Sequence, residues 1–373
     1  MSWRRFSQGL ALAAALTALA AGQAEALASS SSPFPQVGKI FLGVSDRGSK
    51  EGDPEYGVNQ FNAFAKMTGK HPAILQTFAT WGTRFTATRP YERWRKTKTR
   101  PMVHLGTKKV VREGGKEKEV EVIKPEQIAL GAGDEYLLSI NKFFADHKLP
   151  AFIRPLGEPN RGKNLWSTYT EQGKPRGKAH TQYWYIQAFR RIYAIVHGGR
   201  TIKELNAVLA GIKLPPLKSK LPLTTRLPQP PVAIVWSTLT AGSPETKGNY
   251  PGDFWPGERW VDLVAPDFYP DQEFHDLNHL YSRPYLRNEP FGLAEWGVKE
   301  ENPTFARDVI EWALKRRSRV KVLVYYEGFE NEIFNLVKHT ETAKEIRRRL
   351  QSPYFLTYAK PNGGSLPPLT PRP

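Results

Sequence analysis

The stretch Ala151-Phe152-Ile153-Arg154-Pro155-Leu156-Gly157-Glu158 combines a short apolar run with a glutamate directly after it. The run is too short for a helix and turn residues follow it, so it predicts a strand that is buried on both faces. Seven further runs of this kind occur along the chain, at residues 39–44, 73–79, 101–105, 232–236, 261–265, 291–294 and 321–326. Stretches with the apolar spacing of helices lie between several of them, at residues 133–147, 182–196, 305–315 and 341–350.

Short buried strands that alternate with helices predict an α/β protein of the (β/α)8 TIM-barrel class. A doubly wound parallel sheet is the alternative, but no glycine-rich phosphate loop follows the first strand. Asn302-Pro303-Thr304 has the composition of a helix start. Residues 107–126 are charged and predict a hairpin or loop, and residues 214–231 are rich in proline and basic residues. We expect residues 29–360 to form one barrel domain.

The two ends of the chain have the composition of processed or extended segments. Arg4 and Arg5 precede an apolar run at residues 10–21, and an Ala-x-Ala cleavage site follows, so residues 1–28 predict a signal peptide. The run is shorter than the roughly 18–20 residues of a membrane span, so we expect no membrane association after cleavage. A secreted bacterial protein is predicted, with the export route, general or twin-arginine, left open. Residues 361–373 contain five prolines and predict a Pro-rich tail.

The composition excludes several classes of chemistry. The 373 residues include no cysteine, which rules out a disulfide scaffold, a thiol nucleophile and a cysteine-ligated metal. The net charge of +18 raises the possibility of nucleic-acid binding, but the export signal argues against such a partner. Residues 84–119 hold twelve Lys or Arg against four Asp or Glu. That stretch is either a solvated loop region or an attachment to an anionic cell-wall polymer.

Two glutamates follow strands of the predicted barrel. Glu158 lies just beyond the fourth strand, and Glu295 lies in Leu293-Ala294-Glu295-Trp296-Gly297 at the end of the seventh. The active site of a TIM barrel lies at the carboxyl ends of its strands. A pair of carboxylates there can cleave a glycosidic bond, because one protonates the leaving oxygen and the other attacks the anomeric carbon.

The same stretches resemble glycoside hydrolase family 26, a group of β-mannanases and related β-glycanases with clan A barrels. Its acid/base motif reads Arg-Pro-x-His-Glu-x-Asn-Gly, followed shortly by Trp, and Arg154, Pro155, Glu158, Asn160 and Trp166 match it. The resemblance continues in order to the end of the seventh strand, through Val235-Trp236-Ser237, Tyr250-Pro251-Gly252-Asp253, Trp260-Val261-Asp262-Leu263-Val264, Asp267-Phe268-Tyr269 and residues 293–297.

The resemblance implies roles for the matching residues. Glu158 would be the general acid/base and Glu295 the nucleophile, with Arg154 orienting Glu295 and Tyr269 donating a hydrogen bond to it. Asn160 would contact the substrate. Aromatic residues at the strand ends would stack on sugar rings, with core packing as the alternative for each; they are Trp81, Trp166, Trp236, Trp296 and Tyr326.

The chain departs from the family at positions that contact substrate. Gly157 replaces the histidine before the acid/base residue, and Pro159 follows it. The eighth strand ends in Tyr326-Glu327 where the family commonly presents Trp. Glu327 is expected to bind substrate or, more readily, to form a salt bridge with an arginine.

The other acidic residues and the histidines suggest smaller roles. Asp46 and Asp267 could line subsites, whereas Asp253 and Asp262 are interpreted as caps and loop anchors. His275 and His279 have helical spacing but lack the adjacent Glu of a zinc motif, so no metal or other cofactor is predicted.

The sequence therefore predicts a secreted retaining glycoside hydrolase that cleaves β-linked polysaccharide and resembles mannan endo-1,4-β-mannosidase. Two alternatives remain. One is a non-catalytic glycan-binding barrel at the cell wall, and the other is a hydrolase of a decorated bacterial exopolysaccharide.

Overall fold

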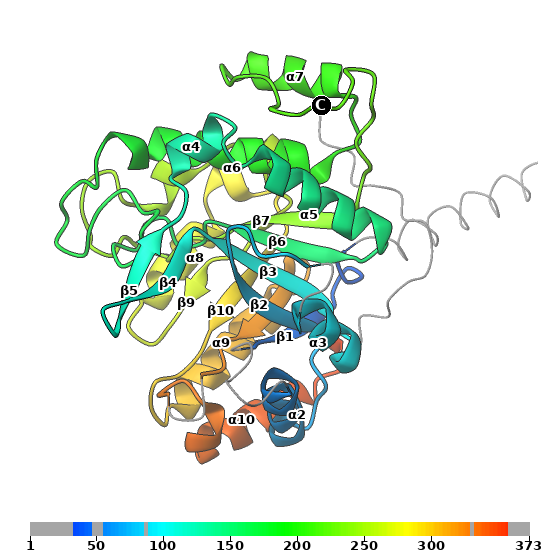
Figure 1. Cartoon of the computed structure of the whole chain (residues 1–373). Helices are drawn as coiled ribbons and strands as arrows, with labels where there is room; N and C mark the ends of the chain where they lie inside the picture. The colour runs from blue at the N-terminus through cyan, green and yellow to red at the C-terminus, as the bar shows by residue number, and fades with distance from the viewer. Residues whose placement is uncertain (1–32, 47–54, 86–88, 329–331, 357–373) are drawn as a thin grey trace, which may run out of the picture.

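Eight parallel strand positions close into a barrel in the computed structural model, which describes residues 33–46, 55–85, 89–328 and 332–356. Neighbouring strands follow the order β11, β1, β2, β3, β6, β7, β8, β10, and β10 pairs with β11 to complete the ring (Figure 1). The strands are β1 (Ile40–Ser45), β2 (Ile74–Thr80), β3 (Arg100–Gly106), β6 (Ala151–Pro155), β7 (Val232–Trp236), β8 (Leu263–Val264), β9 (Asp267–Phe268), β10 (Phe291–Trp296) and β11 (Val320–Tyr325). The closure confirms the predicted TIM barrel and excludes a doubly wound sheet.

The sixth strand position differs from the expectation of one strand over residues 261–265. It is split into β8 and β9, which both pair with β10. Pro266 lies between the two pieces and has no backbone N–H to donate, which interrupts the ladder. The second piece, β9, carries Asp267 at the level of Glu295 in β10, because these two residues are register partners.

The four predicted helices are confirmed to within two residues as α5 (Asp134–Asp146), α6 (Gln182–His197), α9 (Pro303–Lys315) and α10 (Thr340–Leu350). Asn302 caps α9, because its side chain accepts a hydrogen bond from the N–H of Phe305 at 3.0 Å. The expectations did not include α2 (Tyr56–Thr68), α3 (Arg89–Thr97), α4 (Pro125–Ala129), α7 (Ile202–Gly211) or α8 (Phe274–Tyr281). Of these, α7 begins with a capping box formed by Thr201 and Glu204.

Side-chain alternation along the strands divides the core into two layers. Along β7, Ala233 and Val235 belong to the layer inside the barrel, whereas Val232, Ile234 and Trp236 belong to the layer between strands and helices. The inner layer fills the barrel beneath its carboxyl end, so the reactive groups lie above it.

The charged segment at residues 107–126 is confirmed as a hairpin. Its strands β4 (Lys108–Glu113) and β5 (Lys116–Glu121) are antiparallel, and Gly114-Gly115 turns between them with φ of 58° and 78°, as a tight hairpin turn requires. Its cations have carboxylate partners across the strands: Lys108–Glu119 at 2.6 Å, Arg112–Glu117 at 3.2 Å and Lys118–Glu113 at 3.7 Å. Much of the basic charge in this stretch is therefore paired within the hairpin, as in a solvated loop region.

The predicted signal peptide at residues 1–28 and the predicted tail at 361–373 lie outside the described residues. Within the described part of the chain, no helix combines the length and apolar character needed to cross a membrane.

Candidate active site

A cavity of about 1080 Å³ opens at the carboxyl ends of the barrel strands. Glu158 and Glu295 both line it, together with aromatic residues from several strand ends and with Lys108, Val110 and Glu119 of the hairpin. The volume slightly exceeds that of ordinary small-molecule pockets, which suits a ligand of several linked rings.

Glu295 reaches the cavity because β10 is irregular at this point. Phe291 and Leu293 face the helices and Ala294 faces the barrel interior, so strict alternation would turn Glu295 outward. The register with β11 shifts between Leu293 and Trp296. A shift of this kind re-aims side chains, and here Glu295 lines the cavity while Trp296 packs among the helices.

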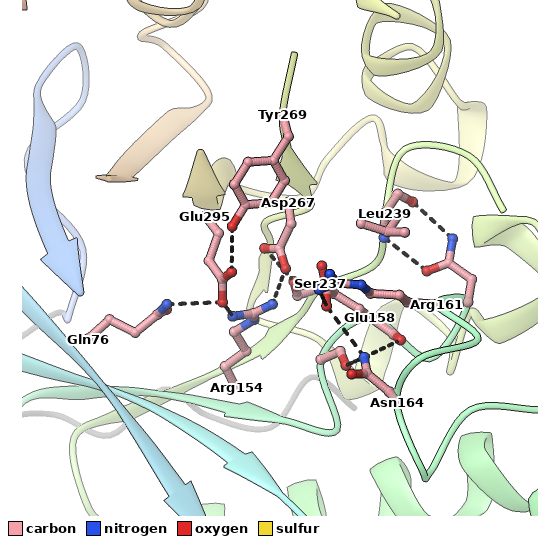
Figure 2. Close-up of polar contacts among 12 residues, drawn as sticks. Gln76, Arg154, Glu158, Arg161, Asn164, Ser237, Leu239, Asp267, Tyr269 and Glu295 are labelled. Carbon is pink, nitrogen blue, oxygen red and sulfur yellow. Dashed lines mark hydrogen bonds and ion pairs between the residues drawn. The ribbon is translucent and has the colours of Figure 1, made fainter. Parts of the chain in front are cut away.

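Three donors from different strands fix the Glu295 carboxylate, as Figure 2 shows. Tyr269 donates its hydroxyl to Oε2 at 2.8 Å, and Gln76 donates its amide to Oε1 at 3.2 Å. Arg154 donates from its guanidinium to the same Oε1. Together these contacts fix the position and orientation of the Glu295 carboxyl at the cavity.

Glu158 lies beyond β6 in an uncommon backbone conformation with φ of 53°. Its N–H donates to the carbonyl of Ser237 at 2.9 Å, which ties it to the end of β7. Arg161 contacts Oε2 at 2.9 Å and Asn164 donates to the same oxygen at 3.4 Å, whereas Oε1 has no hydrogen-bond partner among the described residues. A strained, non-glycine φ at a buried acid is typical of a functional position.

Opposing effects act on the pKa of Glu158. Burial raises the pKa, but the positive charges of Arg161 and then Arg154 lower it by more, so the net shift is downward. Without a substrate, the structure thus favours the ionised form of this carboxyl.

Asp267 forms a third member of the cluster. One carboxylate oxygen from each of Glu158, Asp267 and Glu295 lies within 4.8 Å of the other two. Asp267 pairs with Arg154 and accepts from the hydroxyl of Ser237 at 3.2 Å. Its pKa is raised well above the ordinary value, first by burial and also by the negative charges of Glu295 and Glu158, against the lowering effect of Arg154. Asp267 does not line the cavity, so it acts beneath the site rather than as a subsite wall.

Carboxylate oxygens in this arrangement could ligate a hard cation. Arg154 already pairs with two of the three carboxylates and compensates much of their charge. The donor set is therefore better described as an arginine-centred ion cluster than as a metal centre.

The predicted aromatic platforms separate into two groups. Trp166 and Tyr326 line the cavity, as does Tyr269, which was expected as a donor to Glu295 and not as a platform. Trp236 and Trp296 do not, and the expectation that they stack on sugars is wrong, because their rings are 0% and 1% exposed within the layer between strands and helices.

Trp81 also lies outside the cavity lining. It packs against Tyr136, with ring centroids 5.2 Å apart, and over Gly133. The structure thus gives it a packing role, in place of the expected sugar contact.

Asn160 matches the family motif, but its side chain does not line the cavity. Its amide donates to the carbonyls of Leu239 and Ala241 at 3.1 and 2.9 Å, and its oxygen accepts from the N–H of Leu239 at 2.9 Å. The residue is fully buried, so its polar atoms hold the loop after β7 against the loop that carries Glu158. The expected substrate contact is corrected to this structural role.

Steric crowding by Arg154 explains why glycine stands at position 157 in this chain. A Cβ at this position would lie 2.8 Å from Nε and from a terminal nitrogen of Arg154. The guanidinium is buried and ion-paired, so it cannot move aside without breaking the cluster. The family histidine therefore does not fit here while Arg154 keeps its place.

Several contributors were missed by the sequence reasoning. Gln76, Ser237 and Asn164 contact the carboxylates, and His104 lines the cavity beside Trp166 with a ring distance of 5.8 Å. Burial lowers the pKa of His104 well below its usual value, with Arg154 and Lys108 adding to the effect. Gln76 and His104 lie within β2 and β3, and only Ser237 directly follows a strand, so position after a strand could have indicated Ser237 alone.

The remaining predicted acids occupy structural positions. Asp262 accepts from the N–H of Ile234 at 2.7 Å, and Asp253 accepts from the N–H of Tyr250 at 2.9 Å, which confirms both as anchors. Asp46 pairs with Arg93 at 2.9 Å and does not line the cavity.

Glu327 is buried and does not line the cavity either. It accepts from the N–H of Leu336 at 3.0 Å, and burial raises its pKa to about 8. No arginine within the described ranges forms a salt bridge with it, and its side chain is held instead by this backbone N–H.

Comparison with known proteins identifies solved structures that share this fold. No protein-family model and no curated protein matches the chain. Solved structures do match over about nine tenths of it. Mannanase BCman of Bacillus subtilis has 17% identity and a TM-score of 0.52, with 92% of this chain and 93% of that one covered. GH26A of Muricauda sp. has 16% identity and a TM-score of 0.52, covering 90% and 95%.

A β-mannanase from a symbiotic protist of the termite Reticulitermes speratus, solved with gluco-manno-oligosaccharide, has 14% identity and a TM-score of 0.52, covering 90% and 98%. At such identities the likeness establishes the shared fold. The fold's solved neighbours are thus GH26 mannanases, the group that the sequence motifs resemble.

Proposed function

We propose that this chain is a retaining glycoside hydrolase that cleaves β-linked polysaccharide, of the mannanase type found among its structural neighbours. The observation that carries the proposal is the placement of two glutamates on one cavity, with carboxylate oxygens within 4.8 Å of each other. Retaining enzymes hold their carboxyl groups about 5–5.5 Å apart, whereas inverting enzymes leave room for a water at about 6.5–9.5 Å.

Glu295 is suited to the attacking role. Its hydrogen bonds from Tyr269, Gln76 and Arg154 hold the carboxylate in one orientation. The carboxylate would attack the anomeric carbon and form a covalent glycosyl-enzyme. Arg154 keeps its contact with Asp267 when the charge on Glu295 is consumed, so the guanidinium retains a hydrogen-bond partner.

Glu158 is suited to the proton transfer. Its Oε1 is unpartnered while Oε2 is held by Arg161, so one oxygen can approach the leaving glycosidic oxygen. After the leaving group departs, the ionised Glu158 would take a proton from a water that attacks the glycosyl-enzyme. Both glutamates are regenerated by this cycle, which consumes one water for each bond cleaved.

The signal peptide predicted over residues 1–28 supports a secreted enzyme that meets its polysaccharide outside the cell. A non-catalytic glycan-binding barrel is the competing proposal. Intact donors on Glu295 favour the enzyme, because stacking and binding alone do not require three groups aimed at one carboxylate.

A polysaccharide panel tests the proposal. The purified chain is incubated with β-1,4-mannan, glucomannan, C6-oxidised glucomannan and mixed-linkage β-glucan, and the products are separated by size. We expect at least one polymer to be cut into oligosaccharides. Binding of a polymer without any product would favour the glycan-binding barrel and contradict the hydrolase.

A further inference from the structure

Arg161 occupies an unusual place beside the proposed acid. Its side chain is 42% exposed, whereas that of Glu158, to which it is bonded at 2.9 Å, is 7% exposed. Both residues line the cavity. A ligand in the cavity can therefore reach the guanidinium directly, and Figure 2 shows Arg161 and Asn164 converging on Glu158.

The backbone around Arg161 is held more firmly than its side chain. Its N–H donates to the carbonyl of Glu158 at 3.1 Å, and the N–H of Gly162 donates to Ser243 at 2.5 Å. A Cβ on Gly162 would approach the Thr170 backbone to 2.5 Å, so the main chain is closely packed here. The guanidinium can change partners by side-chain rotation alone.

A second cation lies two residues further on. Lys163 lines the same cavity, is exposed, and forms no salt bridge with any described residue. Lys108 and Lys299 also line the cavity, but they pair with Glu119 at 2.6 Å and with Asp271 at 2.9 Å. Positive charge that a ligand can use is therefore concentrated next to Glu158.

The rest of the cavity argues against a generally cationic channel. Carboxylates line it at Glu171, Glu245, Glu273 and Asp276. An anionic ligand would be favoured at Arg161 and Lys163 and disfavoured elsewhere. The geometry thus suits a polymer with an anionic group on a ring near the cleavage point.

We propose that Arg161 is a specificity-determining residue that binds a carboxylate carried by a sugar ring of the substrate, so that the polysaccharide is a hexuronate-containing β-glycan. The proposal rests on the proposed hydrolase function and names its substrate class. Arginine suits this ligand because its planar fork matches a carboxylate with two parallel hydrogen bonds. Glu158 engages only one nitrogen of that fork.

Substrate recognition would then be coupled to catalysis. While Arg161 pairs with Glu158, its charge lowers the pKa of that carboxyl, and an ionised carboxyl cannot protonate a leaving oxygen. A sugar carboxylate that takes over the guanidinium removes this effect, so Glu158 can take up a proton from solvent. The other charges that face Glu158, those of Arg154, Asp267 and Glu295, stay in place.

The test compares polymers that share one backbone. Glucomannan, C6-oxidised glucomannan and the oxidised polymer after carbodiimide–borohydride reduction of its carboxyls are supplied to the wild type and to Arg161→Gln. We expect the wild type to show a kcat/KM at least about tenfold higher on the oxidised polymer than on either neutral one. Arg161→Gln should lose that preference, so that its kcat/KM values on the oxidised and the two neutral polymers agree within about twofold.

The pH profile on neutral glucomannan provides an independent readout. Removal of Arg161 raises the pKa of Glu158, so the fall of kcat/KM at high pH should move upward in Arg161→Gln. Arg112→Gln on the hairpin tip removes the same charge from an exposed residue outside the cavity lining and should change neither readout.

Equal wild-type rates on all three polymers, with Arg161→Gln slowed equally on each, would overturn the proposal. Failure of the hydrolase proposal looks different, because no polymer is then cut. Affinity electrophoresis of the wild type in gels containing each polymer decides that case. Stronger retardation by the oxidised polymer, lost in Arg161→Gln, supports carboxylate recognition by itself, and equal retardation overturns it.

Discussion

Glu295→Gln is expected to lower kcat on any cleaved polysaccharide by about 10⁴-fold or more, with the chain still folded. The amide keeps the shape of the side chain and can still meet Tyr269, but it is no nucleophile. Arg154 keeps Asp267 as its counter-ion in this variant, so no buried charge is left unpaired. Initial rates and thermal unfolding measured on the same preparation check both halves of the expectation.

Removing the side chain at position 295 distinguishes two roles for Glu295, that of a nucleophile and that of a residue that only binds substrate. Glu295→Gly leaves space for azide, which can attack the anomeric carbon from the vacated side, and a glycosyl azide should appear in the products. Glu117→Gln, at an exposed hairpin residue paired with Arg112, removes one acid elsewhere and should retain wild-type rates. Activity of Glu295→Gln within tenfold of wild type on a cleaved polymer would contradict the role of this carboxylate.

Arg154→Met is expected to reduce the free energy of unfolding by about 3–5 kcal/mol near pH 8. Methionine fills much of the volume but leaves Asp267 and Glu295 buried without their counter-ion. The loss should shrink as the pH falls. At low pH, protonation neutralises the buried carboxylates that have lost Arg154, so the cost of burying their unpaired charge is relieved; as the pH rises they lose these protons and the cost returns.

Urea unfolding of wild type and Arg154→Met at pH 4.5 and pH 8 measures this difference. Arg93→Met, which breaks another buried pair, that with Asp46 outside the cavity lining, is the matched control for loss of a buried arginine. The control should be destabilised while the carboxylates of the proposed site keep Arg154. A loss in Arg154→Met that is the same at both pH values would indicate lost packing instead of exposed charge, and would contradict the ion-cluster description.

The strands, and the two glutamates that the structure brings to one cavity, could be predicted because their signals are local. An apolar run such as Ala151–Pro155, followed by Glu158, identifies both the strand and its reactive end. Register is different, since it depends on partners far along the chain. Trp236 alternates to the helix side of β7, and the shift in β10 sends Glu295 inward and Trp296 outward. No pattern within residues 293–297 indicates that shift.

Asn160 and Gln76 both show that local motifs do not predict contacts between residues far apart in the sequence. The motif places Asn160 two residues after the acid but does not show that Leu239 and Ala241 bind its amide. Gln76 has no motif at all, and its bond to Glu295 spans 219 residues of sequence. Contacts of this kind follow from barrel closure, which brings β2 and β10 to one mouth.

The departures from the family motif form a consistent group. Gly157 is compatible with Arg154 where a side chain is not, and Arg161 pairs with the acid. Both changes lie within four residues of Glu158 and leave the pair with Glu295 intact. The substrate proposal rests on Arg161 because this residue both lines the cavity and contacts Glu158.

The anomeric configuration of the first product tests the central claim most directly. Proton NMR of a cleaved β-linked polysaccharide, recorded before mutarotation, distinguishes the two outcomes. Double displacement by Glu295 and Glu158 predicts that the new reducing end appears as the β-anomer and converts later to the equilibrium mixture. An α-anomer as the first product would show direct attack by water, and would contradict the covalent role of Glu295.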